Sequence, residues 1–395
     1  MKKSTQESTK LHNSRLVLST IYRLGEISRV DVARQTGLTR TTVSEVVSRF
    51  IQEGLVVETG VSPSRGGKRA ILLRVDDDAR HLVGIDLANS AFRGAIVNLR
   101  GNIVQRVSLP IHDRDGESAL GLVFALIDQL LGLTARPILG IGVGTPGLMD
   151  PVQRVVRYAA NLDWYDLPLG DLLEERYRMP IYIANDSQVA ALAEFTFGKQ
   201  AQVNNLVVIK AGRGVSAGIV LNGELFYGDN HSAGEIGHVR MVPGGERCRC
   251  GNTGCLETLV STRTLLHRAR AMAAQDPTSY LNKLVSSPDE IDGDTVLQAY
   301  QAGDPSIRAL IAEAGDYLGI AAAQLAGALN VDQIILAGRL ARYGQGVIAP
   351  MQKRVSQDFL PALARYTQVA PSALGDDVVI LGAASLILRN EVGLI

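Results

Sequence analysis

The three cysteines of this 395-residue chain fall within eight residues, in the stretch CRCGNTGCLE that begins at Cys248. Cys248, Cys250 and Cys255 follow His238 with the spacing His-x9-Cys-x-Cys-x4-Cys. Three thiolates and one imidazole are a donor set typical of closed, tetrahedral zinc sites. A cluster of free thiols is one alternative, and a disulfide is another that a reducing cytosol disfavours. Because four protein ligands leave no position for water, we expect a structural rather than a catalytic Zn²⁺.

A second chemical signal is the stretch VGIDLANSAFRG at residues 83–94. An apolar run leads to Asp86 and then into a turn, which is a common way to build a nucleotide site. Such turns use glycine, because backbone amides must come close to phosphate and a Cβ would block them. Here Ala88, Asn89 and Ser90 occupy the turn. These residues alone are compatible with three alternatives: a working phosphate loop, a broken one and an ordinary hairpin strand.

The elements that must position these residues alternate between strands and helices from about Ala79 onward. This alternation indicates an α/β domain with mixed sheets. The hairpin-rich opening of the domain recurs at 206–225, which indicates two related lobes with a cleft between them. The predicted strands cover 81–88, 92–104, 105–111, 138–147, 179–186, 204–225 and 333–338, and the predicted helices cover 119–133, 187–198 and 306–330.

Residues 13–60 have the pattern of three helices followed by a short strand. Asn13 or Ser14 is expected to cap the first helix, and Ser28 and Thr39 to cap the second and third. Two amphipathic helices joined by a turn that contains glycine describe a helix-turn-helix. A three-helix bundle used for dimerisation is the alternative.

The charge of this N-terminal block indicates a polyanionic partner. Residues 1–75 contain 13 Lys and Arg against 6 Asp and Glu, a net charge of +7, while the rest of the chain has a net charge of −7. The runs at 55–59 and 70–75 would pair as a hairpin with a basic tip, which makes the helix-turn-helix winged. The residues expected to contact DNA are Arg40, Thr41, Thr42, Ser44 and Ser48 in the third helix and Arg65, Lys68 and Arg69 in the wing.

The composition is that of a globular protein, with 46% hydrophobic and 20% charged residues. The lysines at the N-terminus are not followed by the apolar core of a secretory signal. No uninterrupted apolar segment reaches the roughly 20 residues that span a bilayer. We therefore expect a cytoplasmic protein without a membrane partner.

The helix-turn-helix, the actin-like lobes and the cysteine cluster together resemble the ROK family of sugar-responsive repressors and sugar kinases. The most specific motifs are GEIGH at 234–238 and CRCGNTGCLE at 248–257, and the resemblance covers nearly the whole chain. Kinases of this family lack the N-terminal module, so the chain is similar to the repressor branch, which includes regulators of N-acetylglucosamine, glucose and xylose operons. The resemblance implies an α/β fold with an actin-like (ribonuclease H-like ATPase superfamily) sugar-binding domain after the winged helix-turn-helix. The implied domains are the winged helix-turn-helix over 1–76, a first lobe over 79–185 plus 380–395, and a second lobe with the metal motif over 186–379.

The resemblance also implies a sugar-binding site between the lobes. Carboxylates and amides bond to vicinal hydroxyls, and such a site rejects analogues that lack a hydroxyl. His238 would use one ring nitrogen for zinc and turn its other edge to the sugar. The expected partners are operator DNA, a monosaccharide of the xylose, glucose or N-acetylglucosamine type, and further copies of the chain in a homodimer or tetramer. The residues carried over from the family are Asn161, Asn185, Asp186, Glu235, His238 and Glu257.

In kinases of the family, Asp186 would act as general base. The turn after Asp86 lacks the glycines and the lysine of the kinase pattern, and Arg213 and Arg339 replace kinase residues near the nucleotide. Since phosphoryl transfer needs a phosphate cradle, we predict a sensor without enzyme activity that has lost ATP use. The alternatives are an ATP-dependent sugar kinase of the hexokinase type, bifunctional or not, and a repressor whose partner is another protein. We expect the cysteine cluster to transmit sugar binding to the DNA-binding head.

Overall fold

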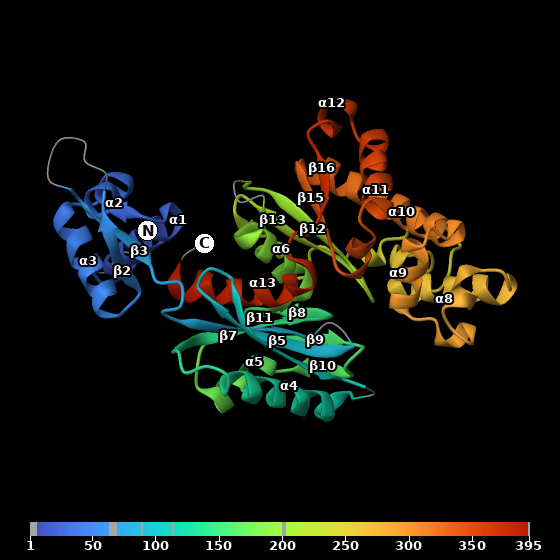
Figure 1. Ribbon diagram of the computed structural model, residues 1–395, viewed down its shortest axis with the longest axis horizontal. Coiled ribbons are helices and arrows are strands. Elements are labelled where there is room, and N and C mark those ends of the chain that lie inside the picture. The colour runs from blue at the N-terminus through green and yellow to red at the C-terminus, as the bar shows by residue number, and fades with distance from the viewer. Residues whose placement is uncertain (1–5, 63–68, 88–89, 113, 200–202, 394–395) are drawn as a thin grey trace.

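The computed structural model describes residues 6–62, 69–87, 90–112, 114–199 and 203–393. Figure 1 shows a small N-terminal head joined to a body of two lobes. The predicted fold class is confirmed, because a winged helix-turn-helix precedes an α/β body with two related sheets. Within the described ranges, none of the helices combines the length and the apolar character that crossing a bilayer requires.

The head combines the predicted helices with a small antiparallel sheet of order β1-β3-β2. Ser28 Oγ accepts a hydrogen bond from the amide of Asp31, and Thr39 Oγ1 accepts one from the amide of Thr42, which confirms both predicted caps. The hairpin of β2 and β3 confirms the wing. The short strand β1 was not predicted. The elements are α1 (Gln6–Leu24), β1 (Ile27–Ser28), α2 (Arg29–Thr36), α3 (Arg40–Gln52), β2 (Val56–Val61) and β3 (Ile71–Val75).

The predicted start of the first helix is wrong. Helix α1 begins at Gln6, so Asn13 and Ser14 lie inside it rather than at its cap. The Ser14 hydroxyl donates to the carbonyl of Lys10 at 2.7 Å, a back-bond that allows serine to sit inside a helix. Arg49 Nη2 donates to the same hydroxyl at 2.6 Å and thereby connects α3 to α1.

The first lobe is a mixed sheet of order β11-β7-β4-β5-β6. Strands β4, β5 and β6 form antiparallel hairpins, while β7 pairs in parallel with β4 and β11 in parallel with β7. Helices α4 and α5 cover the outer face (Figure 1). The main elements are β4 (His81–Asp86), β5 (Ala91–Asn98), β6 (Ile103–Pro110), α4 (Gly116–Leu131), β7 (Ile138–Thr145), α5 (Leu169–Tyr177) and β11 (Ile181–Asn185), and a small sheet contains β8 (Leu148–Asp150), β9 (Val155–Ala159) and β10 (Trp164–Leu167).

The second lobe repeats this topology with the order β14-β13-β12-β15-β16. Again three strands form antiparallel hairpins, a fourth pairs in parallel with the first of them, and the fifth pairs in parallel with the fourth. The internal repeat predicted from residues 206–225 is thus present in the fold. The main elements are α6 (Asp186–Phe197), β12 (Leu206–Ala211), β13 (Val215–Leu221), β14 (Glu224–Leu225), α7 (Glu257–Val260), α8 (Thr262–Gln275), α9 (Gly293–Gln301), α10 (Pro305–Leu329), β15 (Gln333–Ala337), α11 (Gln345–Asp358), α12 (Pro361–Ala364), β16 (Gln368–Pro371) and α13 (Val378–Ile387).

Helices α6 and α13 lie between the two sheets and carry the contact of one lobe with the other (Figure 1). The backbones of α6 and α13 approach so closely at Gly382 that a Cβ there would overlap the carbonyl oxygen of Val189. Helix α13 approaches β7 as closely, since a Cβ on Gly142 would overlap the carbonyl oxygen of Ala383. All of α13 is buried, and it packs on β4 and β7. The predicted domain boundary at 379/380 falls inside this helix, which begins at Val378.

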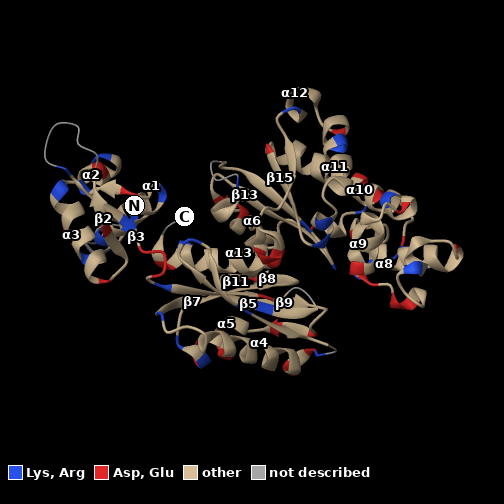
Figure 2. Ribbon diagram, in the orientation of Figure 1, with Lys and Arg blue, Asp and Glu red and all other residues tan. Residues whose placement is uncertain are grey.

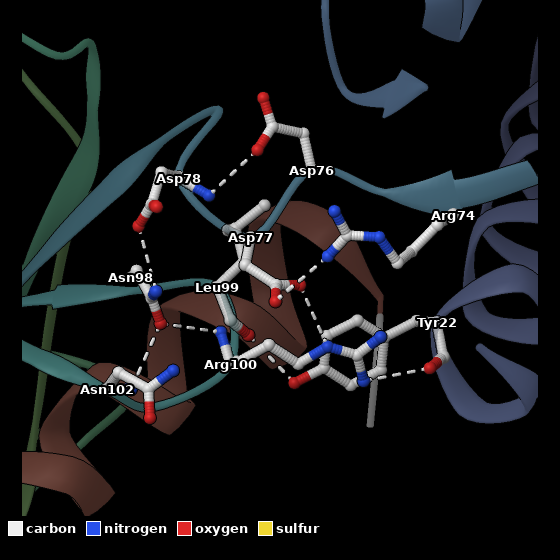
Figure 3. Close-up of polar contacts among 9 residues, drawn as sticks. All are labelled: Tyr22, Arg74, Asp76, Asp77, Asp78, Asn98, Leu99, Arg100 and Asn102. Atoms are coloured by element: carbon white, nitrogen blue, oxygen red, sulfur yellow. Dashed lines mark hydrogen bonds and ion pairs between the residues drawn. The ribbon is translucent and has the colours of Figure 1, made fainter. Parts of the chain in front are cut away.

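The head meets the body at a polar junction, which Figure 3 shows. The Arg100 guanidinium in the β5–β6 turn lies 4.0 Å from the centre of the Tyr22 ring in α1. Arg100 Nη1 donates to the Tyr22 carbonyl at 2.9 Å, and its Nε bonds to Asp77 Oδ1 at 3.0 Å. The Tyr22 hydroxyl donates to the Leu99 carbonyl at 2.7 Å. Helix α1, the linker and the β5–β6 turn therefore meet at one arginine.

A second contact with the head comes from the π-helical turn that follows α13. Arg15 Nη2 in α1 donates to the carbonyl of Asn390 at 2.8 Å. The neighbouring Arg389 forms an ion pair with Glu224 of the second lobe. The short π-helical turn Leu388–Val392 thus touches both the head and the second lobe.

Candidate functional site

The cysteine cluster is assembled as its spacing predicts. The ligand atoms of His238, Cys248, Cys250 and Cys255 all lie within 4.8 Å of one another. Cys250 Sγ is 3.7 Å from Cys255 Sγ, and Cys248 Sγ is 3.6 Å from His238 Nδ1. Zinc–ligand bonds of usual length at tetrahedral angles put two sulfurs about 3.8 Å apart and a sulfur and a nitrogen about 3.6 Å apart. The three cysteines are free thiols, so the donor set fits a metal and not a disulfide.

The local backbone explains why the four ligands converge. His238 ends a 3₁₀ turn that starts at Ile236, and an isolated bridge pairs Arg240 with Cys255. The Cys248 amide donates to the Asn252 carbonyl at 2.7 Å, which closes the loop that carries Cys250. These short-range bonds shape the loop that carries the thiols.

The carboxyl of Glu235 interacts electrostatically with three other predicted sugar-binding residues, one of which, His238, belongs to this cluster. Burial raises the pKa of the Glu235 carboxyl; His238 opposes the rise, and Asp186 and Glu257 reinforce it. The four groups are therefore close enough to interact electrostatically. Glu257 Oε2 is held by the amide of Val215 at 3.1 Å. A cluster of three carboxylates and an imidazole offers acceptors and one donor or acceptor to a polyhydroxylated ligand.

The two predicted asparagines differ in their surroundings. Asn161 is exposed in the first lobe, and its Oδ1 accepts a 3.4 Å hydrogen bond from Arg249, between two cysteine ligands of the second lobe. It therefore lies where the lobes meet. Asn185 is 7% exposed, its Oδ1 caps α6 through Ser187, and its Nδ2 donates to the carbonyl of Gly147 at 2.9 Å. Its polar atoms are already bonded, so the structure gives Asn185 less support as a sugar ligand than the others.

Two basic residues that the sequence analysis did not single out engage the acidic residues of the cleft. Lys210 Nζ lies 2.9 Å from Asp186 Oδ2, and both side chains are largely buried. Burial disfavours the ammonium, but Asp186 and Asp86 outweigh it and raise the pKa of Lys210. Arg93 forms an ion pair with the fully buried Asp86, its register partner across the β4–β5 hairpin. The pairing of Arg93 with Asp86 could have been predicted from the β4–β5 hairpin, which places the two residues opposite each other. The pairing of Lys210 with Asp186 could not, because the two residues are 24 positions apart and lie in different elements.

The departures from the kinase pattern fall partly inside and partly outside the residues that the structure describes. Ala88 and Asn89 lie outside the described residues. Ser90, Arg213 and Arg339 are exposed, and all three line one cavity beside the cleft. With Arg342 also in its lining, this cavity is rich in arginine.

Some of the residues expected to contact DNA lie within the described part of the chain and some do not. In α3, Arg40, Thr41, Ser44 and Ser48 are exposed on the outer side of the head, while the Thr42 hydroxyl is bonded to that of Thr39 at 2.9 Å. Figure 2 shows basic residues on each helix of the head. In the wing, Arg69 is exposed, and Arg65 and Lys68 lie outside the described residues.

Comparisons with known proteins agree with this architecture. The sequence model of the ROK family matches residues 82–390, and that of a winged helix-turn-helix DNA-binding domain matches residues 11–57. The chain is 31% identical to the xylose repressor of Caldicellulosiruptor bescii over 96% of both chains. It is 32% identical to the glucokinase of Halalkalibacterium halodurans, over 79% of this chain and 96% of that one. A solved structure described as a ROK family transcriptional regulator, homolog of the E. coli MLC protein, has 27% identity, a TM-score of 0.85 and 98% coverage of both chains.

Proposed function

The chain belongs to the ROK family, and we propose that it is a sugar-responsive transcriptional repressor of carbohydrate metabolism genes. The observation that carries this proposal is the winged helix-turn-helix joined to a complete two-lobed body in one chain. The similarity to a xylose repressor and to a transcriptional regulator spans head and body alike. The glucokinase matches about four-fifths of the chain, which supports assigning the head to a function that a kinase does not need.

The head binds operator DNA through α3 in the major groove. Short hydroxyls and one arginine at its start suit close approach to base edges and phosphates. Two heads of a homodimer or tetramer would reach successive major grooves, as a palindromic operator requires.

The effector is a monosaccharide of the xylose, glucose or N-acetylglucosamine class. Asp186, Glu235 and Glu257 accept hydrogen bonds from its hydroxyls, and Asn161 contributes from the other lobe. Burial of Glu235 supports this role, because a sugar hydroxyl would replace the water that its carboxyl has lost. A ligand that touches both lobes favours one lobe arrangement over the other, and this differential affinity drives the response.

The cysteine cluster holds a structural Zn²⁺. His238, Cys248, Cys250 and Cys255 would supply the ligands, and the ion would cross-link a loop with little regular structure of its own. Because His238 belongs to the cluster and also interacts with Glu235, the cluster would hold the imidazole of His238 beside the sugar site. Cluster and sugar site thereby share a wall.

We infer that the chain is not a kinase. Lys210 forms an ion pair with Asp186, the residue that a kinase would use as base, and Arg93 forms one with Asp86. A nucleotide–magnesium complex would have to displace both cations. The second candidate function, an ATP-dependent sugar kinase, is favoured by the similarity to a glucokinase and by the presence of Asp186. A coupled phosphorylation assay over several sugars decides between them, and turnover at ordinary enzyme rates would overturn our inference.

The route of the signal to the head runs through the junction at Arg100 and the C-terminal π turn. Among the described residues, the hydrogen bonds and ion pairs that join head and body involve the linker, the β5–β6 turn and the C-terminal end, for example at Tyr22 and Asn390. The cysteine cluster makes none of these contacts. We therefore favour the junction over the cluster as the relay.

The test begins with a thermal-shift screen of monosaccharides, because a ligand that binds only the folded state raises its apparent stability. The sugar found is then titrated against the repressor–operator complex. Glu235→Ala and Glu257→Ala should abolish the sugar response and leave operator binding intact, whereas the exposed Glu175→Ala serves as a matched control. An unchanged sugar response in the first two variants would sink the assignment of the site.

A further inference from the structure

Lys210 places an ammonium group on a face of its strand that is otherwise apolar. In β12, Leu206 and Val208 pack in the core cluster around α6, whereas Val207 and Ile209 pack on the opposite face of the sheet. Because successive strand residues point to opposite faces, Lys210 belongs to the face of Leu206 and Val208. This face contacts α6 (Figure 1). An ammonium at such a position needs a negative partner, since a buried charge without one is costly.

Two carboxylates supply the negative charge. Lys210 Nζ lies 2.9 Å from Asp186 Oδ2, and the exposed fractions of the two side chains are 14% and 9%. Asp86 also favours the charged form of Lys210, and its fully buried carboxylate forms an ion pair with Arg93 as well. Two carboxylates are thus balanced by two cations, all four of which the chain supplies itself.

The ion pair also orients Asp186. Its Oδ2 is engaged by Lys210, and among the described residues its Oδ1 has no hydrogen-bond or ion-pair partner. Oδ1 is therefore the oxygen that remains for a ligand. Proteins often use a divalent ion such as Mg²⁺ or Ca²⁺ to hold buried carboxylates in this way. Here a side chain provides the positive charge and the fixed geometry.

We propose that Lys210 is a positioning residue of the sugar site, an internal cation that stands in place of a divalent ion. It keeps Asp186 ionised and in one orientation, so that Oδ1 accepts a hydrogen bond from a sugar hydroxyl. This inference rests on the proposed function, because it takes Asp186 as a sugar ligand. It adds that sugar binding is independent of Mg²⁺ and Ca²⁺ in the wild type and becomes dependent on them when the ammonium is removed.

The first measurement is sugar binding to the full chain by isothermal titration calorimetry, with xylose, glucose and N-acetylglucosamine as probes and a chelator for divalent ions present. Lys210→Met, which keeps the length of the side chain and removes its charge, should bind the sugar about tenfold or more weakly, the usual effect of losing a charge-assisted hydrogen bond. Lys210→Arg keeps the charge and should retain more of the affinity than Lys210→Met. Lys353→Ala, an exposed lysine of α11, is the matched control and should bind like the wild type.

The second measurement needs no sugar. Mg²⁺ and Ca²⁺ bind oxygen ligands rather than thiolates, so the cysteine cluster does not compete for them. Millimolar Mg²⁺ or Ca²⁺ should enter the space left in Lys210→Ala and raise its melting temperature by about 2 °C or more beyond any effect on the wild type. The same ion should recover the sugar affinity of this variant. Lys210→Met, which fills the space, and the double variant Lys210→Ala with Asp186→Asn should show no such stabilisation.

The two measurements separate this inference from the proposed function. A wild type that binds no monosaccharide overturns the proposed function, while stabilisation of Lys210→Ala by the ions still tests the internal cation. The inference alone is overturned if Lys210→Met binds the sugar like the wild type while Glu235→Ala does not. It is also overturned if neither ion stabilises Lys210→Ala, or if the double variant is stabilised equally. Operator binding by each variant confirms that the chain is folded.

Discussion

Replacing Arg100 by alanine should loosen the head from the body without unfolding either. Arg100 makes three contacts across the junction: the ion pair with Asp77, the hydrogen bond to the Tyr22 carbonyl and the stacking on the Tyr22 ring. The side chains of Arg100 and Asp77 are each 28% exposed, so the ion pair is partly screened by solvent. The substitution deletes all three contacts and creates no cavity in a core.

The magnitude follows from these contacts. A partly exposed ion pair contributes up to about 1 kcal/mol, and a cation over an aromatic ring contributes about 0.5–1 kcal/mol. A charged hydrogen bond to a carbonyl adds about 1 kcal/mol when it is partly exposed. Because the three contacts share one side chain, they do not add fully, and we expect a loss of about 2 kcal/mol. That is roughly a 30-fold shift in the docking equilibrium of the head.

Hydrogen exchange at the junction measures this shift. The amide of Leu99 donates to the Asp77 carbonyl and the amide of Asp76 donates to the Leu55 carbonyl, both at 2.9 Å, so their exchange reports opening of the linker. Both amides should exchange about 30-fold faster in Arg100→Ala. Arg176→Ala is the matched control, because Arg176 also combines an ion pair with stacking, on Asp128 and Phe124 of the first lobe. Equal exchange in wild type and Arg100→Ala, or the same acceleration in the control, would refute the reasoning.

Three further predictions concern the metal, the packing and pH. Cys255→Ser, or a strong chelator, should lower the melting temperature in a calorimetric scan. The binding free energy of a structural Zn²⁺ is typically about 10–16 kcal/mol, and an even share of it is about 3 kcal/mol for each of four ligands. Gly382→Ala should destabilise the body by at least about 1–3 kcal/mol in urea unfolding, since its Cβ would overlap the carbonyl of Val189, whereas Gly121→Ala in open space on α4 should not. Burial raises the pKa of Glu194 and the Ser372 hydrogen bond only partly offsets this, so the wild type should lose stability relative to Glu194→Gln as pH rises from 4.5 through the raised pKa. A stability difference independent of pH would contradict the last point.

The local parts of the structure were predictable because short-range chemistry determines them. Ser28 and Thr39 cap helices within three residues of their own positions, and the cysteine ligands lie within eighteen residues. The same logic failed at Ser14, because a serine hydroxyl can bond back to a helix carbonyl as easily as it can cap.

The contacts that were missed join residues far apart in the chain. Lys210 reaches Asp186 only because β12 lies beside the start of α6, and Arg15 reaches Asn390 across 375 positions. Neither pair leaves a periodic signal in the sequence. Contacts of this kind decide which polar groups of the cleft are already paired, and that pairing bears on whether the chain is a sensor or a kinase. Sequence motifs alone therefore identify the family better than the activity.

The central claim is tested most directly by one DNA titration. Full-length protein is used to select its operator from random DNA, and operator affinity is then measured at fixed salt with and without the monosaccharide that raises its melting temperature. We expect the sugar to change operator affinity by about 5- to 150-fold, the usual range of allosteric coupling. A protein that selects no DNA sequence, or one whose operator affinity is the same with and without every sugar it binds, would contradict the claim.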